Sequence, residues 1–136
     1  ITTIDTVFNV IRILNCENNQ ISYLSIGVPS LVNLNCSNNL LFNSNLDIYY
    51  CTNITTLNTS HNQIDILDIS DNNSKLTTVL CNNNNLSKFI VDTVLDKLIS
   101  FNKLGIIFNA ANQNPPIVPD STKVSTLSTK WTTVLV

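Results

Sequence analysis

The residues best suited to acid-base or nucleophilic chemistry lie close together in the middle of the chain. His61 is the only histidine, Ser60 precedes it, and Asp65 and Asp68 follow shortly after. A serine hydrolase needs these residue types, but they must converge from separate elements with hydrogen bonds between them. One short polar stretch does not supply that geometry, and His61 occupies a variable turn position. The sequence therefore predicts no catalytic residue and no enzyme activity.

The four cysteines are the next candidates, because thiolates bind zinc and paired cysteines form disulfides. Cys16, Cys36 and Cys81 have no Cys-x-x-Cys pair and no histidine partner. Disulfides between neighbouring parallel strands are geometrically awkward. We therefore expect free thiols that pack as small apolar residues, with no metal and no other cofactor. Cys51, next to two tyrosines, has no evident partner.

An acidic loop at 68–74, Asp-Ile-Ser-Asp-Asn-Asn-Ser, offers carboxylates for weak calcium binding. It lacks the glycine and the terminal glutamate of a helix-loop-helix calcium site. Solvated turn residues are the alternative, and the Asn and Ser content of the loop favours it.

Three of the cysteines occupy one position of an internal repeat. The pattern L-x-x-L-x-C/T-x-x-N-x-L fits four segments without a gap, at 11–21, 31–41, 54–64 and 76–86. The turn asparagines of these segments are Asn19, Asn39, Asn62 and Asn84, separated by 20, 23 and 22 residues. A fifth, degraded copy is expected at 95–104, where Lys97, Ile99 and Phe101 would point outward from a strand.

The centre of each repeat alternates apolar and polar residues with period two, which is typical of a strand. Leucine-type residues then point inward together with a second row, the structural ladder of Cys16, Cys36, Thr59 and Cys81. The turn asparagines bond backbone groups where the chain leaves the strand. The return segments are expected to be extended or irregular rather than helical. The sequence thus predicts a mainly β fold, a right-handed solenoid with one parallel β-sheet.

We predict two regions along the chain. The first is a solenoid over 1–108, with repeats near 11–30, 31–53, 54–75 and 76–94 and the degenerate repeat at 95–108. The second is a C-terminal cap over 109–136, which begins with a proline-rich turn. Within the cap we expect a short helix with Asp120 as N-cap, followed by a closing strand at 131–136.

The four repeats resemble leucine-rich repeats, and the short L-x-C-x-x-N form is similar to the cysteine-ladder type of internalin-like adhesins and related bacterial or phage surface proteins. The resemblance covers about residues 11–108, and the chain departs from it at Thr59 and in the eroded fifth copy. It implies a leucine-rich-repeat solenoid that recognises a partner through its concave strand face, at a cell surface, on a virion or otherwise outside the cell.

Composition limits the partners. Only 12% of the residues are charged, the formal net charge is −2, and the seven Lys and Arg residues are scattered, which argues against nucleic acid. No apolar run reaches the roughly 18 residues of a membrane span, so we expect no membrane insertion. Because the chain starts at Ile1 and contains no Met, we expect a mature or excised piece of a longer protein.

The outward strand positions form the one plausible binding site, a neutral amide and hydroxyl surface facing a protein or glycan receptor. Simple solvation of this surface is an equally weighted alternative. A different function, a spike, fibre or virion-decoration protein that self-assembles, follows from open strand edges. The predicted ligand-binding residues are Asn15, Glu17, Asn33, Asn35, Ser37, Asn58, Ser60, Leu80, Asn82 and Phe101.

Overall fold

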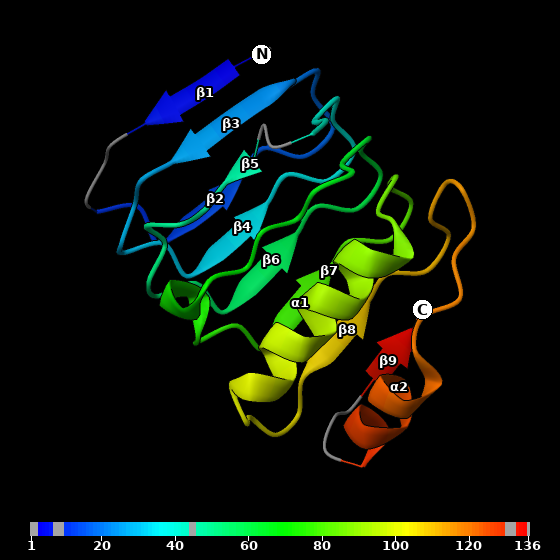
Figure 1. Cartoon of the computed structure of the whole chain (residues 1–136). Coiled ribbons are helices and arrows are strands. Elements are labelled where there is room, and N and C mark those ends of the chain that lie inside the picture. The colour runs from blue at the N-terminus through cyan, green and yellow to red at the C-terminus, as the bar shows by residue number, and fades with distance from the viewer. Residues whose placement is uncertain (1–2, 7–9, 44–45, 130–132, 136) are drawn as a thin grey trace.

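The computed structural model describes residues 3–6, 10–43, 46–129 and 133–135 (Figure 1). These residues form two parallel sheets and few helices, so the predicted mainly β fold with a parallel sheet is confirmed. The larger sheet has the order β2 (Ile13–Asn15), β4 (Asn33–Asn35), β6 (Thr56–Asn58), β7 (Thr78–Leu80), β8 (Ile107–Asn109) and β9 (Thr133–Leu135). The smaller sheet has the order β1 (Thr3–Thr6), β3 (Tyr23–Ile26) and β5 (Leu46–Asp47).

We call each strand of the larger sheet, together with the segment that leads to the next strand, a coil. The strands pair in one register, so that equivalent residues of successive coils lie opposite one another. The inward row formed in this way contains Leu14, Leu34, Leu57, Val79, Phe108 and Val134. Leu34, Leu57 and Val79 are fully buried. Burying such a side chain stabilises the fold by about 1.5–3 kcal/mol. This row is the centre of the core, and it fixes which side chains face outward.

The smaller sheet is built from return segments of the first coils. β1 pairs with β3 from Thr3 opposite Tyr23, and β3 pairs with β5 from Leu24 opposite Leu46. These return segments are extended, as expected. In Figure 1, β1, β3 and β5 lie together at the N-terminal end of the molecule.

The return segment after β7 is helical, which corrects the expectation that no return segment forms a regular helix. α1 (Lys88–Ser100) begins at Ser87, whose hydroxyl accepts a hydrogen bond from the backbone of Ile90 at 3.3 Å. The buried residues of α1, namely Val91, Val94, Leu95 and Leu98, recur at helical spacing and form one apolar face. That periodicity outweighs the β preference of individual residues, so the segment folds as a helix.

The fifth strand predicted at 95–104 is therefore wrong. Lys97 and Ile99 lie in α1, and Phe101 is its C-cap instead of an outward strand residue. The fifth strand of the sheet is β8, in which Phe108 lies opposite Val79. The predicted division between solenoid and cap, which remains a prediction, falls inside this strand.

The end of the chain matches the expected helix and strand where it is described. α2 (Ser121–Ser128) follows Asp120, whose Oδ1 accepts a hydrogen bond from the backbone of Thr122 at 2.8 Å. β9 pairs with β8 in parallel, while residues 131, 132 and 136 of the predicted closing strand lie outside the described residues. No helix of the described residues is long and apolar enough to cross a membrane.

Candidate binding face

The outward side chains of the six-stranded sheet form a surface that we call the front face. It has two rows of equivalent residues. Row one contains Ile13, Asn33, Thr56, Thr78, Ile107 and Thr133, and row two contains Asn15, Asn35, Asn58, Leu80, Asn109 and Leu135. None of these side chains is charged, so the front face presents amide, hydroxyl and apolar groups.

The row-two asparagines hold the backbone where each strand ends. The Oδ1 atom of each accepts a hydrogen bond from the N–H group two residues later, a local turn that Asn favours. The distances are 3.2 Å at Asn15, 3.2 Å at Asn35, 3.1 Å at Asn58 and 3.1 Å at Asn109. Each of these amide oxygens therefore already accepts at least one hydrogen bond from the protein itself.

Three further predicted ligand-binding residues are also engaged with row two. The hydroxyl groups of Ser37 and Ser60, both nearly buried, donate to the same Oδ1 atoms at 2.8 and 2.6 Å. The carboxylate of Glu17 accepts from Asn15 at 3.2 Å and from Asn35 at 2.8 Å. The structure therefore assigns Glu17, Ser37 and Ser60 to supporting the turns.

In every coil of the larger sheet from β2 to β8, the third residue after the row-two position has a left-handed backbone. Its φ angles are 56° at Asn18, 54° at Asn38, 55° at His61, 55° at Asn83 and 57° at Asn112. Asn and Asp adopt this region more readily than most residues with a side chain, because their short polar groups can hydrogen-bond locally. His61 thus stands at a position where asparagine is the rule. The Ser60 hydroxyl donates to Asn58 instead of bonding the His61 ring, so the described residues contain no serine-histidine pair.

The turn asparagines join each coil to the one before it. The Oδ1 atoms of Asn39, Asn62 and Asn84 accept backbone N–H groups of the preceding coil at 2.9, 3.0 and 3.0 Å. Their Nδ2 groups donate to a carbonyl of the preceding coil and to carbonyls of their own turn. Within the described part of the chain, Asn19 donates only to the carbonyls of Cys16 and Glu17 in its own turn.

Gln113 continues this row, and the sequence interpretation missed it. Its Oε1 accepts the N–H of Leu86 at 2.9 Å, and its Nε2 donates to the carbonyls of Cys81 and Ala110 at 3.0 and 2.9 Å. The signal was present at 106–113, where Ile-Ile-Phe-Asn-Ala-Ala-Asn-Gln repeats the spacing of the earlier coils with alanine at the cysteine position.

The cysteine row is buried and holds free thiols, as expected. The thiols of Cys16 and Cys36 donate to the backbone carbonyls of the next coil, both at 3.5 Å. Thr59 makes the same contact through its hydroxyl at 3.4 Å, so it substitutes for cysteine without interrupting the row. Burial raises the pKa of the Cys81 thiol to about 12 and also raises the pKa of Cys36. Cys51 is also buried and donates to the carbonyl of Ile26 at 3.1 Å.

A hollow of about 280 Å³ lies on the front face. It brings together five of the predicted ligand-binding residues, namely Asn15, Asn33, Asn35, Asn58 and Leu80, and adds Ile13 and Thr56. Glu17, Ser37, Ser60 and Asn82 follow the strand ends and do not line it, and Phe101 lies at the end of α1. The hollow is thus the part of the predicted site that the structure assembles.

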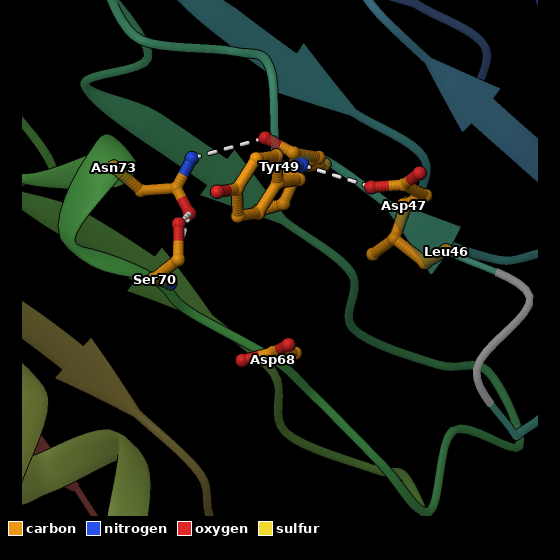
Figure 2. A pocket seen from close by; sticks show the side chains of 7 residues that line it. Leu46, Asp47, Tyr49, Asp68, Ser70 and Asn73 are labelled. Carbon is orange, nitrogen blue, oxygen red and sulfur yellow. Dashed lines mark hydrogen bonds between the residues drawn. The ribbon is translucent and has the colours of Figure 1, made fainter.

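A second hollow, of about 240 Å³, lies beside β5 and contains Asp47 and Asp68 (Figure 2). Asn73 donates to the carbonyl of Ile48 at 3.0 Å and accepts from the backbone of Ser70 at 3.0 Å, which caps the 3-10 helix η1 (Asp71–Asn73). The acidic loop therefore forms a hydrogen-bonded turn. The described residues contain no group of three or more His, Cys, Asp or Glu side chains that could hold a metal.

Comparison of the chain with protein-family models, with curated proteins and with solved structures gives no match. The front face and its hollow are therefore the basis on which a function is assigned.

Proposed function

We propose that this protein is a non-enzymatic recognition or attachment module that binds a protein or glycan through its front face. The supporting observation is the hollow of about 280 Å³, which no charged side chain lines. Its apolar groups come from Ile13 and Leu80 together with Leu14 and Leu34, and its polar groups are amides and the hydroxyl of Thr56. Ligand sites commonly combine apolar surface with a few placed polar groups.

We further infer that the chain is a right-handed leucine-rich-repeat solenoid of the cysteine-ladder type, similar to internalin-like adhesins and related surface proteins of bacteria and phages. Support comes from the stacked leucine and cysteine rows and from the asparagines that bond successive coils. Proteins of this type act by recognition at the concave strand face. On this basis we place the protein outside the cell, on a cell surface or on a virion.

The proposed function is tested by introducing a charged side chain into the hollow. Thr56→Lys introduces an ammonium group where a half-buried hydroxyl stands, whereas Thr52→Lys makes the same change at an exposed position outside the hollow. Binding to an array of immobilised glycans and to a displayed peptide library is measured for both variants. We expect at least a tenfold loss for Thr56→Lys alone, because a desolvated charge without a partner is costly. Equal binding by both variants would refute a role for the front face.

A structural, self-assembling spike, fibre or virion-decoration protein is the second candidate. It is favoured by the edge strand β2, in which Ile13 is 68% exposed and before which Val10 is 83% exposed. Unpaired strand edges with apolar neighbours promote association. The mass of the protein in solution separates the two functions: a monomer with affinity for a glycan or peptide supports recognition, and a defined oligomer without such affinity supports assembly.

A further inference from the structure

Between β2 and β8, row two of the front face is interrupted at one coil. Asn15, Asn35, Asn58 and Asn109 each accept the N–H group two residues later, but the equivalent residue in β7 is Leu80. A leucine side chain has no acceptor. The turn after β7 therefore lacks the side-chain hydrogen bond that its neighbours have.

The donor left over by this interruption is the backbone N–H of Asn82. It donates to none of the residues that the structure describes, whereas the N–H groups of Glu17, Ser37, Ser60 and Ala111 are all taken by row-two oxygens. Because those four groups bond side chains on the front face, the equivalent N–H of Asn82 faces the same surface. Asn82 itself is half-buried.

The neighbours of Leu80 add further donors. Asn58 and Asn109 lie opposite it on the two adjacent strands. The Oδ1 atom of Asn58 accepts two hydrogen bonds and that of Asn109 accepts one, and their Nδ2 groups donate to no other described residue. The interruption therefore combines one backbone donor and two amide donors with an apolar side chain, and Leu80 itself offers a ligand no acceptor.

We propose that this interruption at Leu80 is a subsite for the acetamido group of an N-acetylated amino sugar. The carbonyl oxygen of the ligand accepts the Asn82 N–H and takes the place of the missing asparagine oxygen. The acetyl methyl packs on Leu80, and the Nδ2 group of Asn58 supplies a second hydrogen bond to the carbonyl. This assignment rests on the proposed recognition function.

A sugar is favoured over an acetylated peptide by what lies next to the interruption. Row one places the hydroxyl groups of Thr56 and Thr78 on the strands that carry Asn58 and Leu80. Hydroxyl groups both donate and accept, and they therefore complement the hydroxyl groups of a sugar ring. No charged side chain lines the hollow that contains Leu80, which fits a neutral ligand.

The experiment is a titration of the ¹⁵N-labelled full chain with N-acetylglucosamine, followed by two-dimensional amide NMR spectra. Glucose, which lacks the acetamido group, is the control ligand, and an acetyl-lysine peptide is the competing one. We expect saturable shifts of the Asn82 backbone amide and of the Asn58 side-chain amide with N-acetylglucosamine only. Equal shifts with glucose, or none with either sugar at tens of millimolar, would overturn the proposal. Shifts with the acetyl-lysine peptide alone would overturn the choice of a sugar.

A substitution at Leu80 then tests the subsite by supplying the missing acceptor from the protein itself. Leu80→Asn restores the row-two acceptor for Asn82, so it should reduce the affinity for N-acetylglucosamine at least tenfold. The new hydrogen bond offsets the lost apolar contact, and Tm should stay within about 4 °C of the wild type. Leu104→Asn, the same change at a leucine 78% exposed outside the front face, should bind as the wild type does. Unchanged affinity in Leu80→Asn would contradict the subsite. If Thr56→Lys abolishes binding of a ligand without an acetamido group, the recognition function stands and only this inference fails.

Discussion

The bonds between coils predict that the turn asparagines stabilise the protein according to their position in the stack. Asn62 is the best test, because it lies in the middle and is nearly buried. Its Oδ1 accepts the N–H of Leu41 at 3.0 Å. Its Nδ2 donates to the carbonyls of Cys36, Thr59 and Ser60 at 3.1, 3.0 and 3.3 Å. Asn62→Ala removes all four hydrogen bonds at once.

The loss of stability in Asn62→Ala depends on which hydrogen-bond partners of Asn62 keep another partner in the variant. The carbonyls of Cys36 and Thr59 also accept from Asn39 and Asn84, at 3.1 and 3.0 Å, so they keep a partner in the variant. The carbonyl of Ser60 likewise keeps the N–H of Asn38 at 3.0 Å. The N–H of Leu41 keeps no partner among the described residues. One unsatisfied buried donor costs about 1–3 kcal/mol, and the three bonds whose carbonyls keep a partner add about 0.5 kcal/mol each. The free energy of unfolding should fall by about 3 kcal/mol, a large part of the 5–15 kcal/mol typical of a domain.

Urea unfolding followed by circular dichroism measures this loss as a shift of the midpoint at constant slope. Asn33→Ala is the control for replacing an asparagine, because Asn33 lies on the front face and accepts only a long bond of 3.4 Å from Thr55. Its effect should stay within about 0.5 kcal/mol. Asn19→Ala should cost about 1 kcal/mol, since among the described residues the Asn19 side chain bonds only its own turn. Equal losses for Asn19→Ala and Asn62→Ala would refute the claim that these amides couple successive coils.

Two further predictions concern the turn and the core. His61→Asn should raise the free energy of unfolding by about 0.5–1 kcal/mol, because asparagine adopts the φ of 55° at lower cost; urea unfolding checks it, and a destabilised variant would contradict it. Burial raises the pKa of Cys81 to about 12, so the unfolded thiol loses its proton first and the free energy of unfolding should fall as the pH rises from about 9 to 12. Unfolding measured across this range should show a weaker dependence on pH in Cys81→Ala than in the wild type, and equal slopes would refute it.

The parallel sheet and its inward rows could be predicted from the sequence because period-two alternation recurs with an asparagine at a fixed distance. Leu34, Leu57 and Val79 lie opposite one another as that register requires. The prediction failed beyond Leu86, where the chain inserts α1 before the next strand. Segment 95–104 matched the repeat letters, but Ser87 and the apolar spacing of Val91 and Leu95 carried the competing helical signal.

The binding residues were harder to predict, because one residue type performs different tasks. The sequence shows that Asn15, Asn35 and Asn58 face outward but not that their oxygens bond the next turn. That bond depends on the distance between a side chain and a backbone N–H, which spacing alone does not reveal. Phe101 was misplaced for a different reason, since its assignment depended entirely on the wrong fifth strand.

The abundance of asparagine therefore has a structural cause that limits which groups are left for recognition. Each of the inner coils uses asparagine for a row-two turn, for a left-handed residue or for a bond between coils, so most outward amides serve the fold. A ligand can compete only where a coil departs from this pattern and leaves a backbone donor unused. Leu80 is such a departure among the described residues, because the front face there gains an apolar group while the N–H of Asn82 stays unpaired. Specific recognition is thus expected at an exception to the repeat, while the regular asparagines, although they are more numerous, contribute mainly to stability.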